Sequence, residues 1–173
     1  FEDPSVKKIG QNIKFDFIVL YHHGIIMNSM EDTMLMSYVL DAGKNRHNMD
    51  ILSQIHLEHE TIKFKEIVGT GKNKLNFSEV DINVAKNYAA EDADITFRLY
   101  KLLGSRLREE NLVNIYEIFE KPLIKILAKM EIDGIKVDHK FLSILSKKFG
   151  NKIKKLEKKI FKISKKEFKI GST

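Results

Sequence analysis

The stretch Tyr88-Ala-Ala-Glu-Asp-Ala-Asp94 combines acidic side chains with a tyrosine inside a helical pattern. Apolar residues spaced three and four apart predict one buried helix face, and Asp92 falls on that face, four residues after Tyr88. A carboxylate on a buried face is costly unless it becomes neutral, pairs with a cation or binds a metal. The alternative is that Asp92 lies at the wet rim of the face and is solvated. The apolar residues of this face are Val84, Tyr88, Ile95, Leu99 and Leu102.

The segment Asn12-Ile-Lys-Phe-Asp16 also places a carboxylate four residues after a polar side chain. Asp16 and Asp92 are 76 positions apart, yet an α/β layer could bring their helices to one edge. Two facing carboxylates repel each other unless a divalent cation lies between them. Hydrolysis of a phosphodiester by two metals needs such carboxylates and a group that orients the attacking water. Tyr88, one helical turn from Asp92, is suitably placed for that second role.

Two further patterns have less specific spacing. Gly69-Thr-Gly-Lys72 resembles a phosphate-binding loop, but it lacks the four-residue spacer and the Ser or Thr after the lysine. His56 and His59, with Glu58 between them, could ligate a metal from one helical turn, but no third ligand is near in sequence. We therefore expect a plain loop in the first case and surface or packed histidines in the second.

Two strand-to-helix units are predicted in the first 40 residues. Residues 5–21 indicate a short strand that enters a helix, which Gly24 ends. Residues 25–40 indicate a strand at Ile25-Ile-Met27 and a helix from Met34 to Leu40, with Asp32 as its N-cap. This alternation of strand and helix favours an α/β layer.

Helices are also predicted on either side of the looser segment 60–77. The first begins at a cap provided by Asn48 or Asp50. The second begins at Ser78-Glu-Val-Asp81, which resembles a capping box with Asp in place of the usual Glu, and runs to about Leu107. This second helix carries the acidic stretch described above.

The pattern after residue 107 differs from the pattern before it. Residues 108–114 are polar and predict a linker, which we take as the domain boundary. A helix follows that is interrupted by Pro122 and ended by Gly134. Beyond it, a long amphipathic helix is predicted to seek a helical partner, because its apolar residues recur every seven positions. Those residues are Leu142, Phe149, Leu156 and Ile163.

Composition indicates a globular chain with an uneven charge. With 173 residues and 43% hydrophobic residues, the chain can build one sizeable core or two small ones, and no apolar run reaches the length of a membrane span. The absence of cysteine excludes disulfides and thiolate metal sites and fits a cytoplasmic setting. Residues 134–173 hold 13 lysines and three acidic residues, whereas residues 1–133 have a net charge of −4. The basic end predicts either an anionic partner or a solvated lysine-rich helix face.

Taken in order, several motifs resemble the bacterial DNA polymerase I family, also called family A. The resemblance covers nearly the whole chain, from the later part of the 3′–5′ proofreading exonuclease domain into the start of the polymerase domain. The motifs that carry it are Gln11–Asp16, Asp32–Leu35, Ser37–Leu40, Arg46–Asp50, Thr61–Ile67, Gly71–Phe77, Tyr88–Asp94, Glu120–Leu123 and Ile132–Asp138.

The resemblance implies roles for particular residues. Asp16 matches the family's second exonuclease motif and Asp92 the third, so both would be catalytic and would hold a divalent metal, Mg²⁺ with Mn²⁺ or Zn²⁺ as alternatives. Tyr88 would position the nucleophilic water. DNA is the implied partner, both as a frayed single-stranded 3′ end and as a primer-template duplex. The residues that match positions gripping the 3′ end are Gln11, Asn12, Arg46 and Phe64.

We therefore expect an α/β fold: a partial ribonuclease-H-like (DEDD-type) exonuclease domain at 1–107, the linker 108–114, and at 115–173 the first helices of the polymerase domain at the start of the thumb. The family's first motif, Asp-x-Glu, is absent and is expected before Phe1. The fragment is accordingly expected to have little or no activity, and to self-associate or be partly disordered. Two alternatives stay open: a non-catalytic DNA-binding module that uses the basic C-terminal helix, and a ribonuclease D-like RNA exonuclease.

Overall fold

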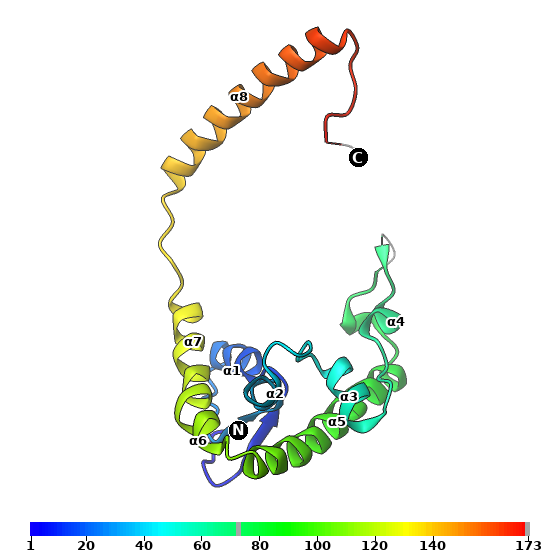
Figure 1. The fold of residues 1–173 in the computed structure, drawn as a ribbon, viewed down its shortest axis with the longest axis vertical. Coiled ribbons are helices and arrows are strands. Elements are labelled where there is room, and N and C mark those ends of the chain that lie inside the picture. The colour runs from blue at the N-terminus through cyan, green and yellow to red at the C-terminus, as the bar shows by residue number, and fades with distance from the viewer. Residues whose placement is uncertain (72–73, 172–173) are drawn as a thin grey trace. The chain divides into compact units, whose positions relative to one another are not determined.

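A computed structural model describes residues 1–71 and 74–171 of the chain. Lys72, the last residue of the loop-like pattern noted above, lies outside the described residues. The chain forms two compact units, Phe1–Asp133 and Gly134–Thr173. Figure 1 labels the α-helices among the elements. In chain order the elements are β1 (Lys8–Gly10), α1 (Ile13–His22), β2 (Met30–Asp32), α2 (Thr33–Asp41), α3 (Met49–Leu57), α4 (Phe64–Val68), η2 (Phe77–Glu79), α5 (Ile82–Glu109), α6 (Val113–Ile115), η3 (Tyr116–Glu120), α7 (Lys121–Asp133) and α8 (His139–Ser164).

The sheet of the first unit consists of two parallel strands in the part of the chain that is described. Lys8 pairs with Met30 and Gly10 with Asp32, and α1 makes the crossover between the strands. The predicted α/β class is confirmed, with helix as the main component. The strand predicted at 25–27 is wrong, because the strand begins at Met30. The backbone N–H of Ile25 is instead bonded to Leu20 O at the end of α1, so this segment cannot pair with β1.

Two apolar clusters hold the first unit together. The larger lies between α2, α3 and α5 and reaches Tyr116 of η3; the smaller joins α1 to α7 (Figure 1). Leu52, Leu99 and Leu103 are fully buried in the larger cluster, while Ile124 and Ala128 of α7 are buried in the smaller. The larger cluster consists of Met36, Leu40, Leu52, Ile95, Leu99, Leu103, Leu107 and Tyr116, and the smaller of Ile13, Phe17, Met27, Met30, Ile124 and Ala128.

Most helix starts follow the predicted caps. Asp32 accepts a hydrogen bond from Met34 N at 2.9 Å, and Asn48 rather than Asp50 caps α3. The capping box predicted at 78–81 is wrong, because the reciprocal pair is formed by Asn76 and Glu79, which open the short helix η2.

The long helix α5 begins after this short turn. Asp81 caps it as a simple N-cap by accepting from Asn83 N at 2.9 Å. The helix ends at Glu109, two residues beyond the predicted end at Leu107. It carries both Tyr88 and Asp92, as the periodicity predicted.

The predicted linker 108–114 lies inside the first unit, where it covers the end of α5, the connection 110–112 and the start of α6. A short π-helix at Tyr116–Glu120 ends two residues before Pro122, consistent with a proline that lacks a backbone N–H. Helix α7 ends at Asp133, and Gly134 has a φ of +68°, a left-handed conformation that glycine adopts without strain.

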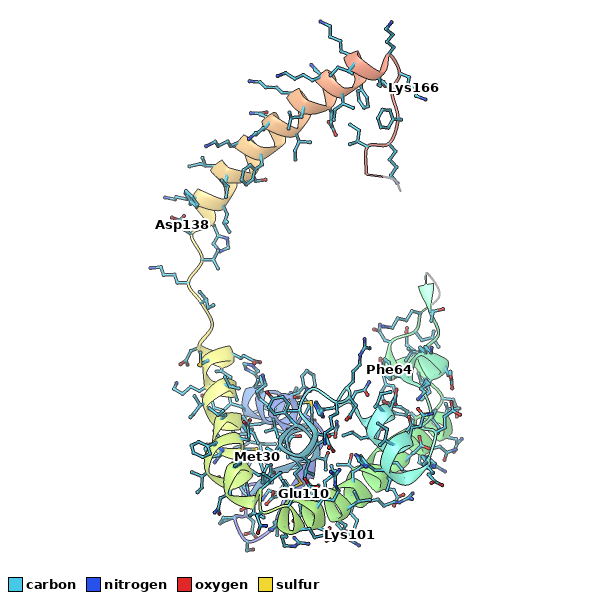
Figure 2. The ribbon with its side chains drawn as sticks, viewed as in Figure 1. Met30, Phe64, Lys101, Glu110, Asp138 and Lys166 are labelled. Carbon is cyan, nitrogen blue, oxygen red and sulfur yellow. The ribbon has the colours of Figure 1, made fainter. Side chains whose placement is uncertain are left out.

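The second unit consists mainly of α8, which is capped by Asp138. This long helix was predicted, and no residue of α8, which is described along its whole length, is buried. Figure 2 shows long side chains extending from it between Asp138 and Lys166. Among the described residues, none of the helices is both long and apolar enough to span a bilayer.

Candidate functional site

Asp16 and Asp92 line one cavity of about 480 Å³ in the first unit. Asp16 comes from α1 and Asp92 from α5, and Gln11 at the end of β1 lines the same cavity. The floor is partly apolar, because Met49 and Phe97 also contribute to the lining. The two acidic residues that the sequence singled out therefore share one concave site.

The turn between β1 and α1 brings Asp16 to this cavity. A Cβ at Gly10 would lie 2.9 Å from the Cβ of Ile13, so only glycine fits where the strand ends against the first helical residue. Asn12 then adopts a left-handed φ of +59° and starts the helix without a side-chain cap bond to the described residues. Asp16 follows in the first turn of α1.

The electrostatics of both carboxyl groups favour a cation. Asp16 is exposed, and the partial desolvation of its carboxyl raises its pKa. Burial also raises the pKa of Asp92; the charges of Glu91 and Asp50 add to this rise, and the Tyr88 hydroxyl opposes it. Oδ1 of Asp92 is buried and has no hydrogen-bond partner among the described residues. A buried carboxylate oxygen without a partner fits the donor chemistry of Mg²⁺ or Mn²⁺.

The ligand set of this cavity is small. Nowhere in residues 1–71 and 74–171 do three or more His, Asp or Glu side chains gather closely enough to hold a metal ion. Asp16 and Asp92 are thus two carboxylates that line the cavity, with no third His, Asp or Glu gathered beside them in the described chain.

Tyr88 lies in an aromatic cluster with Phe64 and Phe77. The ring centroids are 5.9 Å apart for Phe64 and Phe77, 6.0 Å for Phe64 and Tyr88, and 6.1 Å for Phe77 and Tyr88. Burial, together with the neighbouring Asp92 carboxylate, raises the pKa of Tyr88 to about 12. The hydroxyl therefore keeps its proton at neutral pH and can donate a hydrogen bond.

The four residues expected to grip a DNA end are spread over neighbouring surfaces. Gln11 lines the Asp16–Asp92 cavity, but its amide donates to His47 O at 2.7 Å and accepts from Thr33 Oγ1 at 2.5 Å. Asn12 is exposed beside it. The Gln11 side chain therefore already fastens the loop before α3 to the start of α2.

Phe64 and Arg46 are also exposed. Phe64, labelled in Figure 2, lies at the start of α4. Its side chain is 45% exposed, and the Lys74 ammonium lies 5.9 Å from its ring centroid. Arg46 lines a different cavity of about 530 Å³, together with Tyr38 and His47. An exposed aromatic ring and an exposed guanidinium are suitable for stacking on a base and for contacting a phosphate.

Sequence reasoning missed the role of Glu91. Its carboxylate accepts from His59 Nε2 at 2.8 Å and from Ile62 N at 2.7 Å, which fastens the segment before α4 to α5. In the sequence, only its position next to Asp92 could have pointed to a role for Glu91. The His56–His59 metal pair is not formed, because His59 contacts Glu91, while Nε2 of His56 is buried without a partner among the described residues.

Comparison with known proteins identifies the protein family that residues 1–108 match. Residues 1–108 match a family model described as 3′–5′ exonuclease. DNA polymerase I of Rhizobium leguminosarum is 50% identical over 145 residues, which cover 84% of this chain and 14% of that protein. DNA polymerase I of Pseudomonas aeruginosa is 40% identical over 156 residues, which cover 88% of this chain and 17% of that protein.

The fold is shared with a solved polymerase. The POL domain of Pol1 from M. smegmatis, in complex with DNA primer-template and dNTP, aligns with a TM-score of 0.72 at 21% identity, covering 98% of this chain and 26% of that one. The chain belongs to the 3′–5′ exonuclease family of the family A DNA polymerases. It spans only 14% and 17% of the length of the two curated relatives named above.

Proposed function

We propose that the chain is part of a DNA-directed DNA polymerase with 3′–5′ proofreading activity, and that the Asp16–Asp92 cavity is part of its nuclease site. One observation carries this proposal. Two carboxylates 76 positions apart line one cavity, and one of them has a buried oxygen without a partner among the described residues. Both lie within the residues that match the exonuclease family.

The proposed reaction is hydrolysis of the 3′-terminal phosphodiester in a two-metal site. Asp16 and Asp92 would hold divalent metal, Mg²⁺ with Mn²⁺ or Zn²⁺ as alternatives. When bound, the metal supplies Lewis acidity to the phosphate and favours deprotonation of the attacking water. The Tyr88 hydroxyl, which keeps its proton up to about pH 12, would donate a hydrogen bond that orients that water.

The proposed substrate is a frayed single-stranded 3′ end. The exposed Phe64 ring would stack on a base, and Arg46 would contact a phosphate. Gln11 and Asn12 would meet the end of the strand, since Gln11 lines the cavity and Asn12 is the neighbouring exposed residue.

The chain by itself is proposed to be a very weak nuclease. Two carboxylates without a third ligand in the described chain hold divalent metals poorly, because carboxylate count sets affinity. The test is a nuclease assay on matched single-stranded DNA and RNA with Mg²⁺ or Mn²⁺, using Asp92→Asn and, as control, Asp94→Asn on the exposed side of α5.

The outcomes of this assay are distinct. Turnover that is lost only in Asp92→Asn would overturn the proposed inactivity but support the site. Turnover unchanged by Asp92→Asn would contradict the site itself. Preference for RNA would favour the ribonuclease D-like alternative.

A second candidate function is DNA binding without chemistry through α8. The helix is exposed along its length and carries most of the 13 lysines of residues 134–173. Because such binding releases counterions, its affinity should fall steeply with salt. The primer-template duplex is the partner proposed for this surface.

We also propose a cytoplasmic setting, where DNA is accessible. Self-association is proposed for the isolated chain. Large apolar side chains are exposed in both units; Phe15 is 64% and Phe141 59% exposed. Exposed apolar surface of this kind favours association. Sedimentation velocity tests the proposal, and a monomer at all concentrations would contradict it.

A further inference from the structure

Asp32 caps two helices with one buried carboxylate. It is the last residue of β2 and is 1% exposed. One oxygen accepts from Asn12 N at 3.0 Å and from Met34 N at 2.9 Å, and the other accepts from Ile13 N at 3.0 Å. Its bond to Met34 is an ordinary N-cap bond of α2, whereas its bonds to Asn12 and Ile13 reach the start of α1 across the chain.

Neighbouring residues reinforce the same junction. Thr33 Oγ1 donates to Gly10 O at 3.1 Å and to Gln11 Oε1 at 2.5 Å. The N–H of Asp32 donates to the Tyr116 hydroxyl at 3.0 Å, and that hydroxyl donates to Glu31 Oε2 at 3.0 Å. The start of α2 and the start of α1 are therefore tied to each other, and both are tied to η3.

This junction determines where α1 begins and in which direction its first turn runs. Asn12 has no side-chain cap bond to the described residues, so Asp32 supplies the missing cap from another element. A carboxylate at two helix N-termini also matches the positive ends of both helix dipoles. Asp16 lies in that first turn, so its position depends directly on the anchored backbone.

We propose that Asp32 is a positioning residue for the nuclease site: its carboxylate, by capping α1 and α2 together, places Asp16 at the cavity that it shares with Asp92. The inference rests on the proposed function of that cavity. Asp32 does not itself line the Asp16–Asp92 cavity.

The variant that isolates this role is Asp32→Asn. An amide has nearly the same shape, but it keeps one acceptor oxygen, loses the charge and turns an NH₂ donor toward a backbone N–H. The amide therefore cannot keep all three bonds: with its oxygen at the Oδ1 position it keeps those from Asn12 N and Met34 N but loses the bond from Ile13 N, the first residue of α1. The matched controls are Asp81→Asn, which alters the cap of α5, and Asp138→Asn, which alters the cap of α8.

The first measurement is Mn²⁺ affinity of the 173-residue chain by electron paramagnetic resonance. Outer residues that orient metal ligands typically change affinity by about tenfold or more, so Asp32→Asn should bind Mn²⁺ about tenfold more weakly. Both control variants should bind as the unmutated chain does. Equal Mn²⁺ affinity for Asp32→Asn and the unmutated chain would overturn the inference.

The second measurement separates this inference from the proposed function. If the unmutated chain binds no Mn²⁺, the proposed function loses its support, and the carboxyl-carbon NMR signal of Asp16 decides the positioning role. We expect that signal and the amide exchange of Ile13 to change in Asp32→Asn but not in Asp81→Asn. An unchanged Asp16 signal would refute the role.

A milder variant covers the case in which Asp32→Asn fails to fold. Tyr116→Phe keeps the buried ring and removes only the hydroxyl that accepts from Asp32 N. It should shift the Asp16 signal in the same direction by a smaller amount. If Asp32→Asn does not fold and Tyr116→Phe does, an unchanged Asp16 signal in Tyr116→Phe would also refute the positioning role.

Discussion

Asp16 of α1 and Asp92 of α5 line one cavity, together with Ile9 and Gly10 of the strand β1. Asp16 follows β1 directly, and Asp92 lies in the middle of the 28-residue helix α5. Because burial raises the pKa of Asp92, the metal-free protein carries an electrostatic cost at this cavity. A bound divalent cation would remove that cost, which leads to the first prediction.

The variant Asp92→Asn should stabilise the metal-free protein slightly at neutral pH. A carboxyl whose folded pKa is raised costs stability as pH rises from its ordinary value of 3.8 through the folded pKa, and the amide does not ionise. The expected gain is roughly 0.5 kcal/mol in the free energy of unfolding, measured by urea denaturation at pH 7. At pH 3 the gain should vanish.

Bound Mn²⁺ should make the unmutated chain more stable than Asp92→Asn. At a Mn²⁺ concentration ten times Kd, the unmutated chain should gain about 1.4 kcal/mol of stability, whereas Asp92→Asn should gain almost none. If Mn²⁺ stabilises both proteins equally, the metal does not bind at Asp92.

The pair formed by Asp41 and Arg106 should be the strongest ion pair in the first unit. Arg106 Nη1 lies 2.8 Å from Asp41 Oδ2, and this guanidinium holds the pKa of the buried carboxyl at about 2, below its ordinary 3.8. The corresponding stability, about 2 kcal/mol, is present above pH 4 and is lost as pH falls from 4 to 2.

The variant Arg106→Ala should therefore lower the free energy of unfolding at pH 7 by about 2–3 kcal/mol and flatten its dependence on pH between 4 and 2. The matched control is Arg98→Ala, which removes an exposed pair with Asp94 on the same helix and should cost under about 0.5 kcal/mol. Similar costs for the two variants, measured in urea, would show that burial adds nothing to the Asp41 pair.

Phe64 should contribute a stacking contact to single-stranded DNA. Stacking of one base on an aromatic side chain is worth about 1–3 kcal/mol, so Phe64→Ala should weaken oligonucleotide binding about tenfold in fluorescence anisotropy. Phe119→Ala is the control, because Phe119 is 63% exposed on η3 and lies outside the proposed DNA-end surface. An equal loss in both variants would indicate non-specific apolar contact.

Lysines of α8 should determine the salt dependence of duplex binding. Each lysine that contacts a phosphate contributes about 0.9 to the slope of log affinity against log salt, so replacing four with glutamine should reduce that slope measurably. An unchanged slope would exclude α8 as the contact. The four α8 positions are Lys154, Lys155, Lys158 and Lys159, and the control set of exposed lysines in the first unit is Lys65, Lys86, Lys101 and Lys125.

Local features of the fold were readable in the sequence because their physical causes act over three or four residues. The N-caps Asp32 and Asn48 and the long helices α5 and α8 follow from short spacings of this kind, whereas Asp81 caps α5 in place of the capping box expected at 78–81. The family motifs also located Asp16 and Asp92. The strand was misplaced because Ile25-Ile-Met27 is apolar, whereas the actual strand Met30-Glu-Asp32 is mostly charged.

That polar strand is buried because of partners far along the chain. Glu31 is 4% exposed and accepts from the Tyr116 hydroxyl and from Lys121, which lie 85 and 90 positions away. The bonds from Asp32 to α1, from Glu91 to His59 and from Asp41 to Arg106 likewise join separate elements.

The sequence by itself determined the helix periodicity, the caps Asp32 and Asn48, and the two acidic residues proposed to hold a metal. Only the tertiary structure decided that Asp16 and Asp92 share a cavity and that Asp32 serves two helices. The physical reason is range: periodicity and capping depend on neighbours in the chain, whereas the burial and pairing of a carboxylate depend on which distant segments pack around it.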